Sequence, residues 1–282
     1  MKRTGIKPAI GSLVLVIASV ILPRPSAAAQ SKIGAKAAVL MNAQTGKILW
    51  EQNQDLPLPP ASTVKILTAL VVLDHSRTSD LVTIPAEAVR VSGANTKLRA
   101  GEKITAGDLL YAMLLGSGND AAMALALHTA PTLDHFVERM NQKGHTLGAV
   151  RSRFVNPTGM PHPKQLATAA DLALITQAAL ENSEFRKIVS SRTYPWTSRA
   201  WQGTVKNSNK LLSSYDGAIG VKTGSTREAG YCLVAAAQRD GQTYIAVVLK
   251  SQEKTVWNDA AQLLDYAFKH RSLEAGRASS IR

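Results

Sequence analysis

The chain has 282 residues, of which 45% are hydrophobic and 19% are charged, the balance of an ordinary globular protein. Its length supports a substantial core, in one large domain or two modest ones. Only 5% of the residues are aromatic, which argues against a nucleic-acid binder that stacks bases. Cys232 is the only cysteine, so an intramolecular disulfide is excluded and a buried, inert thiol is expected.

The first 29 residues have the organisation of a secretory signal peptide. Three basic residues within the first seven precede an apolar run over residues 12–22, and small residues follow up to Ala29. An apolar run of eleven residues is too short for a membrane-spanning helix, which needs about 20. Cleavage would remove four of the 33 Lys and Arg residues, leaving 29 against 20 Asp and Glu, a net +9. On an exported protein this charge suits anionic envelope polymers or lipid head groups, although a generally basic surface is the simpler alternative.

Hydrophobic periodicity and turn residues predict the elements that follow in chain order. Near the start we expect a hairpin over residues 36–53, a helix from Ser62 to about Leu73, and a short strand with a turn over 80–90. The middle should contain two helices over 104–129, broken at 116–118, and further helices over 133–148 and 168–180. The last part should contain a hairpin over 221–249 and a helix that ends near Phe268, before a polar tail that frays.

Strands at both ends of the chain therefore enclose a largely helical middle. This order predicts an α+β fold, in which the terminal segments pair in one antiparallel sheet with helices packed on it. We expect residues 1–29 to be the signal peptide, residues 30–270 to form one domain, and residues 271–282 to be the polar tail.

A Ser-x-x-Lys motif stands at the start of the expected helix. Ser62 and Lys65 would lie on one helix face, where a free lysine amine could act as the base that a serine nucleophile needs. The alternative is a helix cap by Ser62 with the lysine reaching into solvent. A second copy, Ser251 to Lys254, fits that alternative, since it begins the final helix. Alone, the motif decides nothing.

Two further motifs follow in the chain. Ser117-Gly118-Asn119 falls at the break between two helices, and Lys222-Thr223-Gly224 lies on a strand, followed by Ser225. Each motif has a simple structural alternative. The first could be a glycine turn with Asn119 or Asp120 capping the next helix, and the second could be a strand that ends in a loop. A strand glycine can also mark the close approach of a ligand, which could pair with that strand through its main chain. In this order the three motifs are those of penicillin-recognising serine enzymes.

At these motifs the chain resembles the serine-type D-alanyl-D-alanine carboxypeptidases, the low-molecular-mass penicillin-binding proteins of peptidase family S11. The resemblance covers nearly all of the chain after residue 29, through the blocks LPLPPASTVKILTAL, LRAGEKITAGDLLYAMLLGSGNDAA, FVNPTGMP, TAADLALI, NSNKLL and DGAIGVKTGSTREAG. It implies the penicillin-binding and β-lactamase-like transpeptidase fold, a helical cluster beside an antiparallel sheet with the active site between them. It also implies substrates ending in D-Ala-D-Ala, inhibition by β-lactams, and no metal or cofactor.

The resemblance assigns catalytic roles to four residues. It implies that Ser62 attacks the peptide carbonyl to form an acyl-enzyme and that Lys65 takes the hydroxyl proton. It further implies that Ser117 relays a proton to the leaving D-alanine, while Asn119 hydrogen-bonds the substrate backbone.

The strand motif would bind substrate. The resemblance implies that Lys222 and Thr223 hold the terminal carboxylate and that Lys222 favours a neutral Lys65. Gly224 would let the ligand approach, and the resemblance implies that the backbone amides of Ser62 and Ser225 form the oxyanion hole.

Two features depart from the family's pattern. Thr158 stands in NPTGM where the family commonly has histidine, which puts substrate preference in doubt but not the chemistry. The tail AGRASSIR has no apolar face, so we expect a secreted or loosely wall-associated protein without an amphipathic membrane anchor.

Two rivals stay open at this point. A class A β-lactamase shares the motif set but uses a glutamate to activate the deacylating water. The expected Glu-x-x-x-Asn stretch does not occur in this chain, and the second motif reads SGN instead of SDN. A non-catalytic, basic envelope-binding protein on the same fold would instead fail to react with penicillin.

Overall fold

The computed structural model describes residues 33–278, with side chains up to residue 270. The predicted signal peptide lies outside the described residues, so it stays a prediction. Among the described residues, no helix combines the length and the apolar character needed to cross a membrane.

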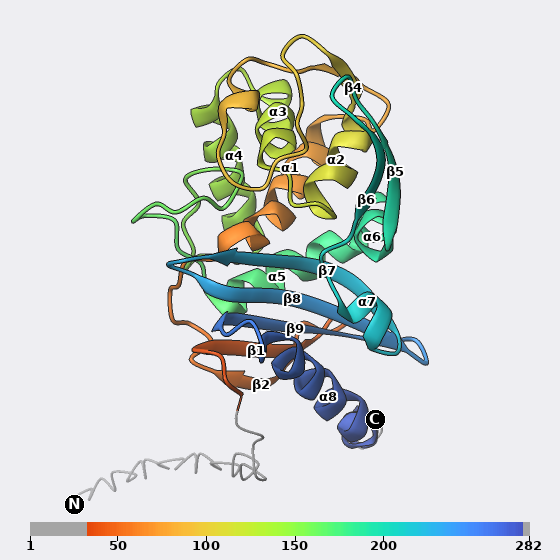
Figure 1. Ribbon diagram of the computed structural model, residues 1–282. Helices are drawn as coiled ribbons and strands as arrows, with labels where there is room; N and C mark the ends of the chain where they lie inside the picture. The colour runs from red at the N-terminus through yellow and green to blue at the C-terminus, as the bar shows by residue number, and fades with distance from the viewer. Residues whose placement is uncertain (1–32, 279–282) are drawn as a thin grey trace, which may run out of the picture. The chain divides into compact units, whose positions relative to one another are not determined.

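A five-stranded antiparallel sheet runs through the molecule (Figure 1). Its order is β2-β1-β9-β8-β7, so the first strand pairs with the last one, as predicted, and β7 lies at an edge. The strands are β1 (Ala37–Asn42), β2 (Ile48–Gln52), β7 (Ala218–Thr226), β8 (Gly230–Arg239) and β9 (Gln242–Ser251).

The prediction of a single hairpin over residues 221–249 was incomplete. This stretch holds three strands, because a second turn separates β7 from β8. In that turn the Thr226 hydroxyl accepts a hydrogen bond from the Ala229 amide at 3.0 Å, and Gly230 takes a φ of +64° that favours glycine. The additional turn makes β7 a separate edge strand.

The two faces of the sheet are covered by different helices. Strand alternation sends Leu40, Leu233 and Val248 to one face, where helix α8 (Val256–Ala278) packs. The other face carries Val39 and Val247, contacts α5 (Ala169–Glu181) and α6 (Ser183–Ser190), and shares one hydrophobic cluster with α1 (Lys65–His75). Helix α8 continues ten residues past Phe268, where fraying was predicted, because residues 269–278 are mostly good helix formers.

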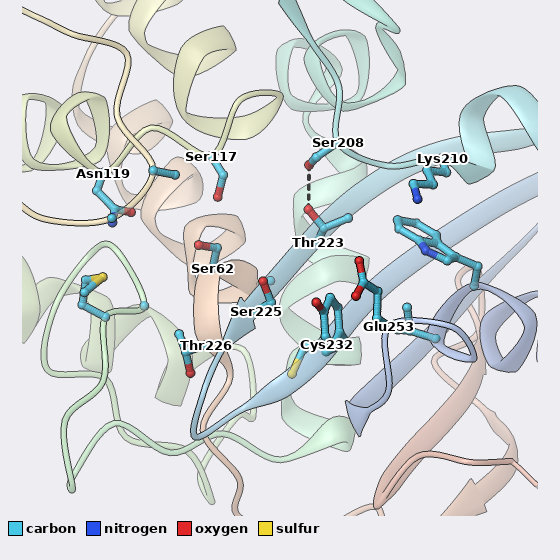
Figure 2. A pocket seen from close by; sticks show the side chains of 18 residues that line it. Ser62, Ser117, Asn119, Ser208, Lys210, Thr223, Ser225, Thr226, Cys232 and Glu253 are labelled. Atoms are coloured by element: carbon cyan, nitrogen blue, oxygen red, sulfur yellow. Dashed lines mark hydrogen bonds between the residues drawn. The ribbon is translucent and has the colours of Figure 1, made fainter.

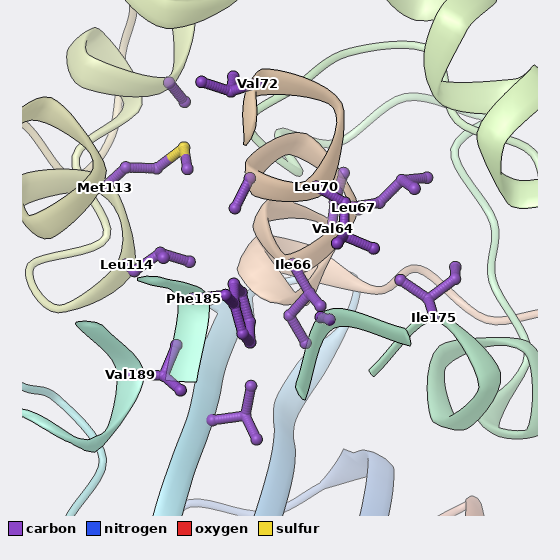
Figure 3. Packing of buried hydrophobic residues seen from close by; sticks show 14 of the residues in the cluster. Val64, Ile66, Leu67, Leu70, Val72, Met113, Leu114, Ile175, Phe185 and Val189 are labelled. Carbon is purple, nitrogen blue, oxygen red and sulfur yellow. The ribbon is translucent and has the colours of Figure 1, made fainter. Parts of the chain in front are cut away.

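Helix α1 lies at the centre of the helical side. Residues 65–72 are all buried, and Figure 3 shows Ile66, Leu67 and Leu70 facing side chains of the surrounding helices. These helices include α2 (Ala106–Leu114), α3 (Asn119–Thr129) and α4 (Leu133–Thr146). Each fully buried Leu or Ile contributes roughly 1.5–3 kcal/mol. The packing therefore fixes the position of the turn that precedes α1.

The smaller elements of the helical side are η2 (Ala88–Arg90), the strand pair β3 (Leu81–Thr83) and β4 (Lys103–Thr105), and the hairpin of β5 (Thr193–Thr197) and β6 (Gln202–Lys206). The short helix α7 (Leu211–Ser214) contacts β7, and its Leu211 packs in the same cluster as α8. The β5–β6 hairpin and α6 were not predicted. Only Trp196 and Val205 of the hairpin are buried, so its sequence lacks a clear alternation of apolar and polar residues.

Candidate active site

The three predicted motifs meet at one pocket between the helices and β7 (Figure 2). The motif residues that line this pocket are Ser62, Ser117, Asn119, Thr223, Gly224 and Ser225. The two motif lysines, Lys65 and Lys222, lie behind the pocket surface and are 0% and 1% exposed. The structure thus brings together all eight residues that the sequence singled out.

Ser62 is held by close backbone contacts on both sides. It lies in the one-turn helix η1 (Ala61–Val64), and Ala61 before it has a φ of +48°, which costs a non-glycine residue about 1–2 kcal/mol. A Cβ on Gly159 would overlap the Ala61 carbonyl oxygen, and one on Gly224 would lie 2.7 Å from the Ser62 backbone nitrogen. The glycine of the strand motif therefore lets β7 approach the backbone of Ser62.

The Lys65 amine contacts three oxygen atoms. Its Nζ lies 2.9 Å from the Ser62 Oγ, 2.7 Å from the Asn119 Oδ1 and 2.5 Å from the Thr158 carbonyl oxygen. The Thr158 contact is made by the main chain, which a histidine at that position would also supply. The departure at Thr158 therefore leaves this hydrogen bond intact.

The environment of Lys65 favours the neutral amine. Burial lowers the pKa of Lys65 well below its ordinary value, the charge of Lys222 lowers it further, and the charge of Asp120 opposes both. Burial also lowers the pKa of Lys222 to about 7. The electrostatic interaction between the two amines shows that Lys222 of the strand motif belongs to the same buried cluster as Lys65 of the helix motif.

Asn119 has a fixed orientation. Its Nδ2 donates to the Ser92 carbonyl oxygen at 2.7 Å, while its Oδ1 accepts from Lys65. A carbonyl oxygen can only accept, so the amide nitrogen must face Ser92. The Asn119 backbone amide donates to the Ala94 carbonyl oxygen at 2.7 Å. Residues 92–98 therefore form a loop, here called the 92–98 loop, that holds Asn119 in place.

Asp120 anchors this loop, a role that the sequence did not reveal. Its carboxylate is fully buried and accepts hydrogen bonds from the Thr96 amide and hydroxyl and from the Leu98 amide, at 2.9–3.1 Å. The alternative of a helix cap is wrong, since the N-cap of α3 is Gly118 without a side-chain cap, and Asp120 instead holds a loop that is distant in sequence. An Asp in the first turn of a helix does not reveal from the sequence that it binds a loop more than 20 residues away.

Ser208 is a pocket residue that sequence reasoning missed. Its Oγ lies 2.6 Å from the Thr223 Oγ1, and its amide donates to the Leu115 carbonyl oxygen at 3.2 Å. The Lys222 Nζ donates to the Thr223 carbonyl oxygen at 3.0 Å. Two hydroxyls and a lysine thus gather at one end of the pocket, near Ser117, whose hydroxyl also points into it (Figure 2). The sequence signals were the polar turn Asn-Ser-Asn and its place in the block NSNKLL, neither of which assigned Ser208 a role.

The second Ser-x-x-Lys copy is structural. Lys254 is exposed, as predicted. The predicted helix cap is wrong, because Ser251 ends β9 and its Oγ donates to the Asp259 carboxylate at 2.6 Å. Cys232 is buried at the pocket edge, and burial raises the pKa of its thiol to about 11. The predicted burial is confirmed, and the raised pKa is consistent with an inert thiol because little thiolate forms at neutral pH.

Comparison with known proteins decides the family. Residues 24–253 match peptidase family S11, described as D-alanyl-D-alanine carboxypeptidase. The chain belongs to this family. As an S11 enzyme it is a serine hydrolase of the D-alanyl-D-alanine carboxypeptidase type, as predicted.

Individual S11 relatives agree over most of the chain. The D-alanyl-D-alanine carboxypeptidase of Streptomyces sp. strain K15 is 36% identical over 262 residues, which cover 86% of this chain and 90% of the relative. The carboxypeptidase DacF of Bacillus subtilis is 32% identical over 277 residues, 95% of this chain and 71% of DacF.

A solved S11 structure confirms the predicted fold class. The crystal structure of a D-alanyl-D-alanine carboxypeptidase from Mycobacterium tuberculosis H37Rv superposes with a TM-score of 0.81 at 33% identity, covering 85% of this chain and 92% of that one. The fold is therefore that of penicillin-binding DD-peptidases.

Proposed function

We propose that this enzyme removes the terminal D-alanine of peptidoglycan stem peptides through an acyl-enzyme on Ser62, with Lys65 as the base. The observation that carries the proposal is the 2.9 Å contact between the Lys65 Nζ and the Ser62 Oγ inside a buried cluster. A serine hydroxyl needs an adjacent base to become a nucleophile, and a buried amine with a lowered pKa supplies one at neutral pH.

The hydrogen-bonding capacity of a neutral amine fits this role. Such an amine has two N–H donors and one lone pair. The donors face the Asn119 Oδ1 and the Thr158 carbonyl oxygen, which can only accept. The lone pair is left for the Ser62 hydroxyl, so the Ser62 proton passes to Lys65 as the Ser62 Oγ bonds to the scissile carbonyl carbon.

The remaining pocket residues complete the reaction. Ser117 relays the proton from Lys65 to the leaving amine, and the C–N bond breaks to release D-alanine. Asn119 positions the substrate backbone through its amide. Lys222 and Thr223 bind the terminal carboxylate, an interaction favoured while Lys222 is charged.

The strand motif also stabilises the charge that develops on the substrate oxygen. Gly224 brings β7 against Ser62, so that the amides of Ser62 and Ser225 can donate to that oxygen. Water then hydrolyses the ester. A β-lactam acylates the same serine and stays bound, because the class A deacylating glutamate has no counterpart motif in this chain.

The enzyme acts in the cell envelope under this proposal. Residues 1–29 direct export as a cleaved signal peptide, and residues 30–270 form the catalytic domain. The product is a shortened stem peptide of the wall, whose maturation and shape depend on such trimming. The excess positive charge suits an anionic envelope polymer as a partner.

The test is release of D-alanine from a soluble peptide that ends in D-Ala-D-Ala. Wild-type enzyme and the control Ser213→Ala, which changes an exposed serine, should release it, and Ser62→Ala should not. Fluorescent penicillin should label the first two proteins alone and be lost slowly. D-alanine release by Ser62→Ala, or rapid turnover of penicillin as in a β-lactamase, would contradict the proposal.

A further inference from the structure

Nearly all the net charge of the described chain comes from two segments. Residues 97–103 and 192–210 carry seven Lys and Arg and one acidic residue, a net +6. The other residues between 33 and 278 carry 20 Lys and Arg against 19 Asp and Glu, a net +1. A surface that serves only solubility intersperses both signs, whereas a concentration of one sign attracts ligands of the other.

The fold joins these two segments side by side. The Trp201 Nε1 donates to the Thr96 carbonyl oxygen at 2.9 Å. The two carboxylate oxygens of Glu102 accept from the amides of Arg99, at 2.6 Å, and Arg199, at 2.9 Å. Glu102 is 2% exposed, so the one acidic residue of the two segments is turned inward. The seven cations, here called the basic rim, are Lys97, Arg99, Lys103, Arg192, Arg199, Lys206 and Lys210.

The basic rim is exposed and its charges are not neutralised. All seven residues are exposed, and within the described residues none of them forms an ion pair. Elsewhere Lys143, Arg151 and Arg239 each pair with an Asp. Arg192 donates only to the Leu212 carbonyl oxygen, which leaves its charge available. The rim thus gathers seven unpaired cations in two neighbouring segments, which gives it a concentrated positive potential.

The rim leads to the active-site pocket. The β5–β6 hairpin extends beside the helices from the level of α6 to β4 (Figure 1). Lys206 ends β6, and Lys210 lines the pocket together with Ser208. The five residues of β6 alone extend roughly 17 Å. Cations spread over such a length suit an extended ligand with repeated negative charges better than one small anion.

We propose that the basic rim binds an anionic, phosphate-repeat polymer of the cell envelope and so holds the pocket close to its polymeric substrate. The assignment of the polymer to the cell envelope rests on the proposed function. The expectation that the rim binds an anionic polymer rests on the charge and the length of the basic rim. Neutralising several phosphates releases their counterions, so the affinity should fall steeply with salt.

The test compares two variants that lose the same charge, with long-chain inorganic polyphosphate as the probe. The rim variant is Lys97→Gln, Arg99→Gln, Arg199→Gln and Lys206→Gln combined. The control variant replaces four exposed cations outside the rim, namely Arg77, Lys164, Lys187 and Lys269, by Gln. Affinity is measured by fluorescence anisotropy at several salt concentrations.

We expect the rim variant to bind about tenfold more weakly than wild type, with a salt slope smaller by about 3, and the control variant to bind within about twofold of wild type. Both variants should release D-alanine from a short peptide at the wild-type rate. Equal loss in both variants, no binding by wild type, or preference for phosphatidylglycerol vesicles over polyphosphate would overturn the proposal. If wild type binds the polymer but does not release D-alanine, the proposed function is refuted, and polymer binding by the basic rim is supported.

Discussion

Replacing Asp120 by Asn should loosen the 92–98 loop. The carboxylate accepts from four donors, of which Thr96 supplies two and the amides of Leu98 and Ala121 supply the others. An amide nitrogen at either oxygen position faces at least one of these donors and leaves it unpaired. A buried unpaired N–H costs about 1–3 kcal/mol, and the remaining bonds weaken as the acceptor becomes neutral. The free energy of unfolding should fall by about 3–5 kcal/mol.

Acylation should also slow in this variant, because Asn119 is displaced. This effect can be separated from the change in the pKa of Lys65. The loop holds Asn119 through the carbonyl oxygens of Ser92 and Ala94, so a displaced loop misplaces Asn119 beside Lys65. The Asp120 charge raises the pKa of Lys65, and its removal lowers that pKa further. The neutral base therefore persists to lower pH. The acid limb of the acylation profile should shift to lower pH while the plateau rate falls.

Thermal unfolding and the rate of labelling by fluorescent penicillin measure the two effects. For a domain of this size each kcal/mol shifts the Tm by about 2–4 °C, so Asp120→Asn should lower it by roughly 10 °C. Asp134→Asn, an exposed acid in the first turn of α4, is the control and should lose only about 0.5 kcal/mol. Labelling is compared at a temperature where all proteins are folded. An unchanged Tm or an unchanged plateau rate for Asp120→Asn would refute the anchoring role.

Two further changes test the strand motif. Gly224→Ala places a Cβ 2.7 Å from the Ser62 backbone nitrogen, so β7 must shift and the rate of acylation should fall at least about 100-fold. The control is Gly144→Ala, whose Cβ would have contacts of 3.6 Å or more and which should keep full activity. Lys222→Met should flatten the dependence of stability on pH. The pKa of Lys222 is about 7 folded against an ordinary 10.5, so the unfolded chain binds more protons between these values and wild-type stability rises with pH. Wild-type acylation by Gly224→Ala, or an identical pH dependence for Lys222→Met, would contradict these expectations.

The sheet frame and the large helices could be predicted because each is a predominantly apolar stretch bounded by turn residues. The pairing of β1 with β9 followed from strands at both ends of the chain. The β5–β6 hairpin escaped prediction because Pro195 interrupts a short, mostly exposed strand. The turn between β7 and β8 was missed although residues 225–230 are mostly polar and end in a glycine, because the whole stretch was interpreted around the later turn at residues 239–241. Tertiary contacts decide such short segments, and a sequence window does not contain them.

The site was predictable where side chains form motifs and unpredictable where the main chain supplies the contact. Ser62 and Lys65 are three residues apart, so helical geometry alone places them together. The other partners of the Lys65 amine are a main-chain oxygen at Thr158 and the side chain of Asn119, 93 and 54 residues away. A carbonyl oxygen belongs to every residue type, so no sequence pattern marks the one at Thr158.

The buried motif lysines and the cations of the basic rim differ in one physical respect, which is their access to water. Lys65 and Lys222 are buried, so desolvation favours their neutral forms. This suits Lys65 as a base, and it costs stability at every pH below the ordinary lysine pKa. The cations of the basic rim stay in water and keep their charge, which suits polymer binding and costs little stability. The packing of α1 offsets the buried amines, since eight consecutive buried residues hold Lys65 where solvent cannot reach it. A variant that lets water reach α1 should therefore raise the pKa of Lys65 and lose acylation at neutral pH before it loses the fold.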